Sequence, residues 1–402
     1  MSRILVISNG HGEDLSGCLL AKQLIEVGNK VDALPIVGHG NHYLKANIRI
    51  MGKTRLFATG GLGYNSFKGR LDDLVNGQII YFFKKLFLIY SLRKKYDYFL
   101  IVGDIVPIFF AWFSQKKYFL YLVAYSSHYE GKLKLPWPCK YFLKSKNLKK
   151  IYARDLLTAD DLTNQLKRKV NFFGNPFMDE FLQYKNRSNN AKNSFLLLPG
   201  SRIPEMERNF NIMLDLLENL SDLKIFKEFS FEFALVDSFS KKKIEEILHH
   251  RNWEFCHSNE NTDNIIYKFK IIKINLIWNS FEKLLIKSDV VISMSGTAAE
   301  QAVGLAKPVI QIEGHGPQFT NSFASAQRRL LGEYVFCATN YKTKEQQIKE
   351  TINIILNIIY LLKLDGKFLS QCKKNAIVRI GEIGACLKIS RNILDSLKNE
   401  NN

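Results

Sequence analysis

The chain has 402 residues, and 57 Lys and Arg against 38 Asp and Glu give it a formal net charge of +19. Its content of 46% hydrophobic and 24% charged residues is typical of a soluble globular protein and excludes a disordered chain. Six cysteines without a CxxC pair exclude a disulfide scaffold and a zinc ribbon, and scattered reduced thiols fit the cytoplasm.

The first part of the chain alternates apolar runs with a helical pattern. Residues 3–8 form a β-branched apolar run, 9–14 a glycine-containing loop, 15–28 a segment of helical spacing, and 30–38 a second apolar run. This order predicts the strand, loop, helix and strand of a parallel α/β unit. Further apolar runs end in small or polar residues, as buried parallel strands do, at residues 98–104, 117–127, 149–155 and 169–175.

A second series of the same kind starts near residue 194. The pattern predicts a strand running into a loop over 194–202, a helix over 204–220 and a strand over 231–237. Residues 288–314 predict strand, loop, helix and strand, and residues 344–398 are helical in pattern.

The segment between the two series is polar and rich in Pro, Asn and Ser, which marks a hinge. We predict an N-terminal Rossmann-like domain over 1–175, a hinge over 176–193, a second Rossmann-like domain over 194–370, and a C-terminal helix over 371–402 that packs back towards the first domain. The predicted fold class is α/β, with two doubly wound domains that face each other across a cleft where ligands bind.

Two loops of the first domain carry candidate catalytic groups. In the loop 9–14, His11 is a candidate base or an ordinary loop histidine, and Glu13 is a candidate catalytic residue or a helix N-terminal acid. A dinucleotide fingerprint would need a glycine where the chain has Leu15, which disfavours a dehydrogenase. Asp104 ends an apolar strand, where burial raises a carboxyl pKa towards that of a general base, and it also suits a helix N-cap.

Two loops of the second domain place small and hydroxyl residues directly before a helix. Such loops expose backbone amides that bind phosphate, and Arg suits bidentate phosphate contact. Each loop alone could be an ordinary capped strand–helix junction, but two in one domain indicate a diphosphate site. The candidates are Gly200, Ser201, Arg202 and Glu205 in the first loop, and Ser295, Gly296, Thr297, Ala298 and Glu300 in the second.

A glycine-rich segment over 313–321 follows the apolar strand KPVIQI. It carries the amide side chains of Gln318 and Asn321, which suit hydroxyl groups because both donate and accept hydrogen bonds. The alternative is a glycine-rich turn with an ordinary helix behind it.

These motifs resemble those of a known family. LLLPGSRxxE, SGTAAEQAVGLAKPVI and FFGNPFMD are similar to segments of the lipid-A-disaccharide synthases. SNGHGED, YARDxxTADDL and GPQFTxxFAxxQxRLLG resemble more closely the cyanobacterial-type lipid-A-disaccharide-synthase-related proteins. These three motifs occupy Ser8–Asp14, Tyr152–Leu162 and Gly316–Gly332, and the resemblance covers nearly the whole chain.

The resemblance implies a GT-B glycosyltransferase that needs no metal or other cofactor and binds a UDP-sugar mainly in its C-terminal domain. The synthases transfer a diacylglucosamine from UDP to a lipid-linked monosaccharide phosphate at the cytoplasmic membrane face. By position, Ser201 and Arg202 would contact the diphosphate together with the Ser295 loop. Gln318 and Asn321 resemble the Gln-x-x-Asn pattern that binds donor sugar hydroxyls in related enzymes. The synthases have a helix glutamate one position after Glu300, where this chain has Gln301.

We therefore predict an inverting glycosyltransferase of lipid A or other glycolipid synthesis, cytoplasmic and peripheral to the inner membrane. Asp104 or His11 would take the proton of the acceptor hydroxyl, and Arg202 with two helix starts would hold the charge of the leaving UDP. The basic charge indicates codon bias, or attraction to an anionic membrane or substrate. The Phe- and Tyr-rich segment 79–121 would favour the membrane surface.

Three other interpretations stay open. A nucleotide-sugar 2-epimerase of the same architecture would use no lipid, and a GT-B protein that binds UDP without transferring a sugar would show no turnover. A nucleic-acid-binding protein would depend strongly on salt, but no helix-turn-helix, RNP motif or finger spacing accompanies the charge.

Overall fold

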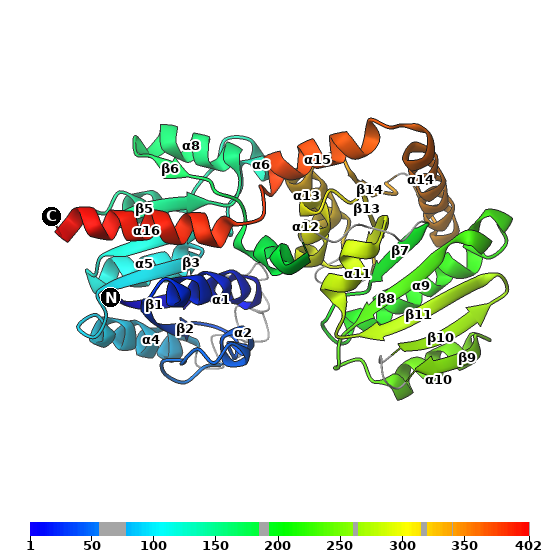
Figure 1. Ribbon diagram of the computed structural model, residues 1–402, viewed down its shortest axis with the longest axis horizontal. Coiled ribbons are helices and arrows are strands. Elements are labelled where there is room, and N and C mark those ends of the chain that lie inside the picture. Colours follow the sequence, from blue (N-terminus) through cyan, green and yellow to red (C-terminus); the bar gives the residue numbers. More distant parts are fainter. Residues whose placement is uncertain (56–77, 185–192, 260–263, 315–319, 340, 402) are drawn as a thin grey trace. The chain divides into compact units, whose positions relative to one another are not determined.

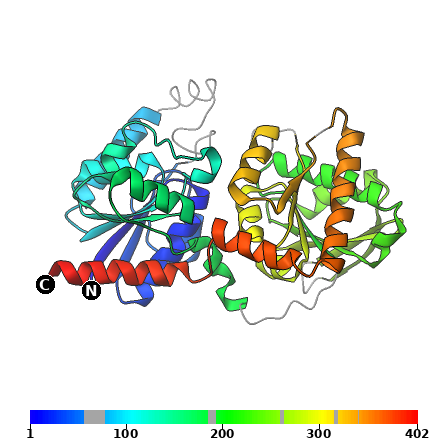
Figure 2. The same cartoon turned by 90° about the horizontal axis from the view of Figure 1, so that it is seen from above.

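The chain folds into two compact units, seen in the computed structural model of Figure 1. The first unit consists of Met1–Leu182 and Gly381–Asn402, and the second of Gln183–Ile380. Both ends of the chain therefore belong to the first unit (Figure 2). The structure describes residues 1–55, 78–184, 193–259, 264–314, 320–339 and 341–401.

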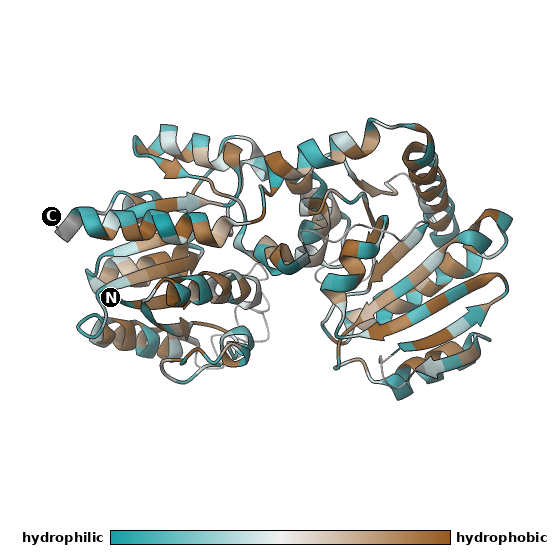
Figure 3. Cartoon of the chain, in the orientation of Figure 1, coloured by the Kyte–Doolittle hydropathy of each residue, from teal (hydrophilic) through white to brown (hydrophobic). Residues whose placement is uncertain are grey.

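The first unit has a six-stranded sheet with the order β2-β1-β3-β4-β5-β6, and every pair of neighbours is parallel. Leu5 and Ile7 of β1 point to one face and Ile4 and Val6 to the other, and all four are buried because helices cover both faces. The neighbouring β3 is mainly hydrophobic along its length (Figure 3). The strands are β1 (Arg3–Ser8), β2 (Lys30–Pro35), β3 (Tyr98–Gly103), β4 (Tyr118–Leu122), β5 (Leu148–Ala153) and β6 (Val170–Asn171).

Helical layers flank this sheet. α1 and α16 pack on one face, and α4, α5, α7 and α8 pack on the other. Asp104, Ser126 and Asp155 accept backbone N–H groups and so start α5, α6 and α8. The helical segments of the unit are α1 (His11–Glu26), α2 (Asn41–Lys45), α4 (Gln78–Leu92), α5 (Ile105–Ser114), α6 (Ser127–Glu130), α7 (Cys139–Leu143), α8 (Leu156–Leu166), the 3-10 helix η1 (Pro176–Tyr184), which runs across the boundary, and α16 (Ala385–Asn401).

The first helix starts earlier than the sequence predicts. Residues 9–14 were expected to form a loop, but α1 begins at His11. Gly10, with φ of 145°, turns the chain directly before the helix, and Glu13 and Asp14 supply negative charge to its first turn. The run 169–175 was expected to be a strand, but β6 has only two residues.

The second unit has an eight-stranded sheet with the order β14-β13-β12-β7-β8-β11-β10-β9. Its central strands are parallel, whereas β10 pairs antiparallel with both β9 and β11 and extends the sheet at one edge, which the sequence patterns did not predict. The strands are β7 (Ser194–Leu198), β8 (Ser230–Leu235), β9 (Glu254–Asn259), β10 (Asn264–Phe269), β11 (Ile272–Trp278), β12 (Val290–Ser293), β13 (Val309–Gln311) and β14 (Val335–Cys337).

The sequence predicted helices at the positions of α9, α12, α14 and α15, but not α10, α11 or the 3-10 helix η2. Ser240, Thr320 and Thr343 accept backbone N–H groups and start α10, α13 and α14. No helix in the described part of the chain is long and apolar enough to cross a membrane. The helical segments are α9 (Glu205–Leu220), the 3-10 helix η2 (Lys224–Glu228), α10 (Lys241–His250), α11 (Phe281–Lys287), α12 (Gly296–Gly304), α13 (Asn321–Leu331), α14 (Lys344–Leu364) and α15 (Phe368–Arg379).

The segment 371–402, expected to be one helix, is two helices divided between the units. Asn375 and Arg379 of α15 donate to carbonyls at the end of α13, so α15 stays with the second unit. The chain then turns at Gly381, with φ of 91°, and α16 joins the first unit. Asp179, within the expected hinge, caps α16 by accepting backbone N–H groups of residues 384–386 at 2.6–3.1 Å. The expected hinge 176–193 is likewise divided, after Leu182.

Candidate functional site

In each unit the predicted site loops follow two neighbouring strands whose helices pack on opposite faces of the sheet. In the first unit these strands are β1, followed by α1, and β3, followed by α5. In the second unit they are β7, followed by α9, and β12, followed by α12. Such switch points in the strand order are where open α/β sheets bind ligands, outside the carboxyl ends of the strands.

Asp104 stands at the carboxyl end of β3 and has two roles. Its Oδ1 accepts the backbone N–H of Val106 at 3.0 Å, so it is the N-cap of α5. Both of its carboxylate oxygens accept from Nδ2 of Asn9, each at 3.1 Å. Burial raises the pKa of Asp104 to about 6, although both hydrogen bonds oppose that shift. The cap and a carboxylate suited to general base catalysis therefore coexist in one side chain.

Glu13 lies beside this carboxylate. A Cβ atom on Gly103 would stand 3.7 Å from Cγ of Glu13, so the glycine before Asp104 lets the first turn of α1 approach the end of β3. Burial and the nearby charge of Asp104 raise the pKa of Glu13 to about 8. Near neutral pH, Asp104 is mainly ionised and Glu13 mainly protonated, which gives a proton acceptor and a proton donor side by side.

Asp14 belongs to a separate buried network. Its Oδ1 accepts from the Ser8 hydroxyl at 2.5 Å, and the same hydroxyl lies 3.0 Å from the hydroxyl of Tyr43. Gly17 makes room for this tyrosine, because a Cβ atom there would stand 2.2 Å from the phenolic oxygen. Burial raises the pKa of Asp14 to about 7. The network ties α1 and α2 to the end of β1.

His11 is the first residue of α1, and its catalytic role stays a prediction because its side chain lies outside the described residues.

The segment that resembles YARDxxTADDL fastens the loop after β4. Asp155 accepts from the Ser126 hydroxyl at 2.7 Å, and Asp161 accepts from the Ser127 hydroxyl at 2.9 Å. Arg154 donates to the carbonyl of Val123 at 3.1 Å. These residues therefore shape the carboxyl edge of the sheet at the loops that follow β4 and β5.

The two predicted diphosphate loops of the second unit lie next to each other. Leu198 pairs with Ser293, and the N–H of Met294 donates to the Leu198 carbonyl at 2.9 Å. Gly200 has φ of 103°, and a Cβ atom there would stand 3.5 Å from the Met294 carbonyl oxygen. The loop before α9 therefore passes over the loop before α12.

Their polar side chains differ in exposure. Ser201, Arg202 and Thr297 are exposed, whereas Ser295 and Ala298 are half-buried. The first helical residue of α12 is Gly296, where a Cβ atom would stand 3.5 Å from the Phe323 ring and 3.7 Å from Nε2 of Gln327, both on α13. The starts of α9 and α12 therefore lie near each other, because the loops that precede them are in contact. Arg202 is exposed in the loop before α9. Backbone N–H groups at helix starts favour anions, so the arrangement suits a diphosphate.

The two acidic residues predicted for the second unit's site, Glu205 and Glu300, both lie within helices. Glu205 is the first residue of α9, and Glu300 lies in the second turn of α12; both are half-buried. Gln301, which aligns with the glutamate of the synthases, is buried with 3% of its surface exposed. Glu300 is therefore the more accessible of the two.

Of the predicted sugar-binding pair, Asn321 is exposed at the first position of α13, and Gln318 lies outside the described residues. Sequence reasoning missed Asn9, although its position directly after a buried strand was a usable signal.

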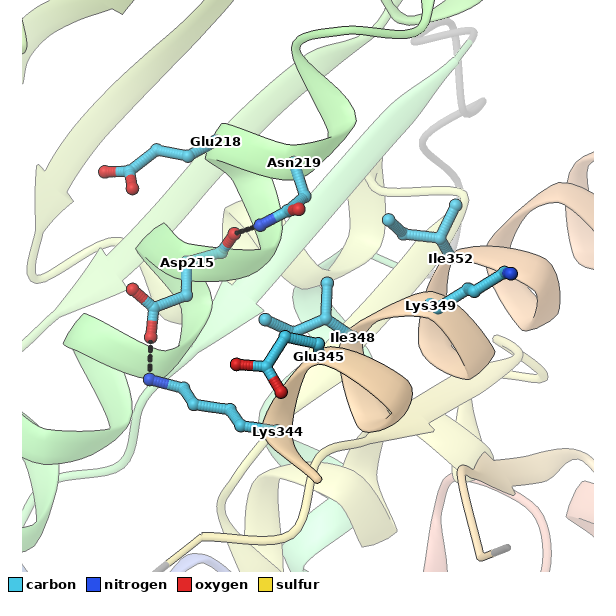
Figure 4. Close-up of a pocket in the computed structure, with 8 residues that line it drawn as sticks. All are labelled: Asp215, Glu218, Asn219, Lys344, Glu345, Ile348, Lys349 and Ile352. Carbon is cyan, nitrogen blue, oxygen red and sulfur yellow. Dashed lines mark hydrogen bonds and ion pairs between the residues drawn. The ribbon is translucent and has the colours of Figure 1, made fainter. Parts of the chain in front are cut away.

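A hollow between α9 and α14 contains none of the predicted residues (Figure 4). Two of its three acids form ion pairs: Lys344 contacts Asp215 at 2.5 Å, and Arg251 contacts Glu218 at 2.7 Å. Asp215 lies ten residues into α9, which is about 15 Å along the helix from the diphosphate loop. The hollow is a structural ion-pair network. Among the described residues, no group of three or more His, Cys, Asp or Glu side chains is placed to hold a metal ion.

No protein-family model matches this chain, and no curated protein matches it significantly. Solved structures match it over nearly its whole length. MurG of Acinetobacter baumannii has a TM-score of 0.58 at 13% identity, covering 98% of this chain and 100% of its own. A UDP-GlcNAc 2-epimerase of Neisseria meningitidis, bound to UDP-GlcNAc, has a TM-score of 0.54 at 16% identity, covering 99% and 100%. The spinosyn rhamnosyltransferase SpnG, complexed with thymidine diphosphate, has a TM-score of 0.56 at 11% identity, covering 97% and 99%.

The chain therefore has the GT-B fold, as the sequence predicts. At these identities the likeness shows the fold alone, and the similar structures include both glycosyltransferases and 2-epimerases. The narrower resemblance to lipid-A-disaccharide synthases stays a prediction.

Proposed function

We propose that the chain is an inverting glycosyltransferase that moves an acylated glucosamine from UDP to a lipid-linked sugar at a membrane surface, as the lipid-A-disaccharide synthases do. The second unit would bind the UDP-sugar, and the first would supply the base and hold the acceptor. The epimerase bound to UDP-GlcNAc has the same fold, which supports a UDP-sugar as the donor.

The chemistry follows from the groups already described. The acceptor hydroxyl attacks the anomeric carbon on the side opposite UDP, its proton passes to Asp104, and UDP leaves with the bonding electron pair. Arg202 and the starts of α9 and α12 would stabilise the charge on the departing diphosphate, so the proposal needs no metal. Its backbone and hydroxyl contacts would come from Ser201, Ser295, Gly296, Thr297 and Ala298.

The observation that carries the choice of a lipid acceptor is an exposed apolar surface on the first unit, which we call the aromatic face. Its residues on α4 recur at helical spacing, so they share one side of the helix. Phe87 is 64% exposed and Phe83 50% exposed. The aromatic face consists of Ile79, Ile80, Phe83, Phe87 and Tyr90 of α4, Phe113 of α5 and Tyr141 of α7.

Ring contacts connect the three helices of the aromatic face. The rings of Tyr90 and Phe113 lie 5.8 Å apart, and those of Trp112 and Tyr141 also lie 5.8 Å apart. Phe109 contacts both Phe113 and Trp112 and so joins the two pairs. Contiguous exposed apolar surface of this kind marks a protein or membrane interaction site.

Basic side chains border the aromatic face and favour an anionic bilayer as its partner. Arg93 stacks over the Tyr90 ring at 3.7 Å. Lys84 is exposed on α4, and Lys94 is exposed directly after it. Lys140 lies next to Tyr141 on α7 and is exposed. Aromatic rings with flanking Lys and Arg suit the boundary between headgroups and acyl chains.

Two incubations test the proposal. The purified chain is given UDP-diacylglucosamine with an acylated glucosamine phosphate in phosphatidylglycerol vesicles, and separately UDP-GlcNAc alone, and the products are analysed by mass spectrometry and NMR. A disaccharide lipid with release of UDP supports the transferase. Formation of the 2-epimer of UDP-GlcNAc without lipid overturns it.

A specific observation favours the 2-epimerase as a second candidate. Such an enzyme needs one group to remove a carbon-bound proton and another to return a proton on the opposite face of the sugar. Asp104, with a pKa of about 6, would accept the proton, and its neighbour Glu13, with a pKa of about 8, would hold a proton on the same side, so the return on the opposite face would need a further group. UDP binding without either product would favour the third candidate, a GT-B protein without turnover.

A further inference from the structure

Asn9 joins the two strand ends that carry the first unit's site. It directly follows β1, while Asp104 follows the neighbouring strand β3. Its side chain is 6% exposed, and its Nδ2 donates to both carboxylate oxygens of Asp104 at 3.1 Å. The Asn9 amide and the Val106 N–H, which donates to Oδ1 at 3.0 Å, therefore fix the direction in which the carboxylate points.

The other end of this amide has no partner. Oδ1 of Asn9 is buried and accepts no hydrogen bond from the described residues. The amide group cannot be flipped to exchange its oxygen and nitrogen, because Oδ1 would then face the two carboxylate oxygens of Asp104 and no hydrogen bond could form. Buried carbonyl oxygens nearly always accept a hydrogen bond, so this atom marks a position for a donor that a ligand supplies.

We propose that Asn9 is the positioning residue of this site: its nitrogen holds the Asp104 carboxylate in place, and its oxygen accepts a hydrogen bond from a hydroxyl of the sugar that reacts there. The second half rests on the proposed function, since it takes the ligand to be a sugar. The first half holds whatever the substrate is.

The charges around Asp104 show why such a link matters. Burial raises the pKa of Asp104, and the hydrogen bond from Asn9 lowers it. Glu13 on α1 lies against Asp104, and Arg154 after β5 lowers the pKa of Glu13. Without the amide, the carboxylate would take up a proton at a higher pH and lose its use as a base. The titratable and charged groups around Asp104 and its neighbour Glu13 are Asp14, Cys139 and Arg154.

The test is the titration of Asp104 in the full chain. Aspartate labelled with carbon-13 at the carboxyl carbon is followed by NMR against pH, and Asp104→Asn identifies the signal. We expect a midpoint of about 6 in the native chain. In Asn9→Leu, which keeps the shape and removes both polar atoms, the midpoint should rise by at least about half a pH unit, as loss of a hydrogen bond to a charged group requires.

Asn29→Leu is the matched control. Asn29 is also a buried asparagine of the first unit, but its amide contacts the Leu24 carbonyl and the Ser2 N–H at the other edge of the sheet. Its replacement should leave the Asp104 midpoint unchanged. If Asn9→Leu does not fold, Asn9→Ala serves instead. An unchanged Asp104 midpoint in the folded Asn9 variant would overturn the positioning role.

The kinetic test concerns the sugar hydroxyl. If transfer is observed, Asn9→Leu should raise KM for the acceptor about tenfold and shift the acidic limb of the kcat profile upwards, and Asn29→Leu should do neither. An unchanged KM would overturn the hydroxyl contact. If the native chain transfers no sugar, the proposed function fails, while the NMR midpoints still decide the link between Asn9 and Asp104.

Discussion

The carboxyl edges of the two sheets share one topology but differ in the charge and exposure of their polar groups. In the first unit the polar groups at the switch point are buried acids, and burial raises the pKa values of Glu13, Asp14 and Asp104. In the second unit the corresponding loops expose Ser201 and Arg202 beside two helix starts. Buried acids suit proton transfer and exposed cationic loops suit anion binding, so exposure rather than topology separates the two roles.

The largest expected effect comes from removing the carboxylate of the first unit. Asp104→Asn should lower kcat about 10²–10⁴-fold, the usual contribution of a general base, while leaving the affinity for UDP unchanged. Kinetics and calorimetry together measure this. Asp160→Asn, at an exposed position of α8, is the control. A variant at Asp104 that transferred sugar at the native rate would remove the base from the mechanism.

In the second unit, removing a charged side chain is expected to weaken UDP binding. Arg202→Ala should weaken UDP binding about 10–100-fold, because a charge-assisted contact to the diphosphate is lost. Calorimetry on the native chain and the variant measures the difference. Arg208→Ala replaces a different exposed arginine, which lies on α9 and not in the loop before it, and this variant should bind UDP normally. Equal weakening in both variants would point to general charge rather than to the loop.

The aromatic face provides a third contrast between the units. The double variant Phe83→Ser with Phe87→Ser should reduce binding to phosphatidylglycerol vesicles about tenfold or more, since each ring contributes apolar area to the bilayer. Flotation at fixed ionic strength measures this. Tyr360→Ser with Leu364→Ser removes exposed apolar side chains of the second unit, on α14, and should leave flotation unchanged. Loss in both double variants would argue against a specific face.

The smallest expected effect is on stability against pH. Glu13, with its pKa raised from 4.5 to about 8, holds a proton in the folded state that the unfolded chain releases. Its contribution to the free energy of unfolding is therefore complete below about pH 4.5 and is lost as the pH rises through 8. Glu13→Gln mimics the protonated form, so urea unfolding should depend less on pH between 5 and about 8 in this variant. A native chain that grows more stable over that range would contradict the raised pKa.

The sequence by itself determined the parallel strands that carry the site loops and the positions of those loops. Apolar runs that end in small or polar residues predicted β3 and β7, and the residues after them, Asp104 and Ser201–Arg202, occupy the predicted carboxyl ends. This works because parallel strands are buried on both faces and leave their chemistry to the loops that follow. The same local patterns predicted two doubly wound α/β domains, and the resemblance of the loop motifs to a known family implied the GT-B fold.

Only the tertiary structure decided which groups meet and how far each is buried. Asn9 and Asp104 are 95 residues apart in sequence, and the pairing of β1 with β3 brings them together. The C-terminal segment divides at Gly381 because α15 donates to the end of α13 while Asp179 caps α16. The order of the Glu13 and Asp104 pKa values depends on their burial and on the charge each places near the other. These are long-range effects of packing, and no local pattern of residues encodes them.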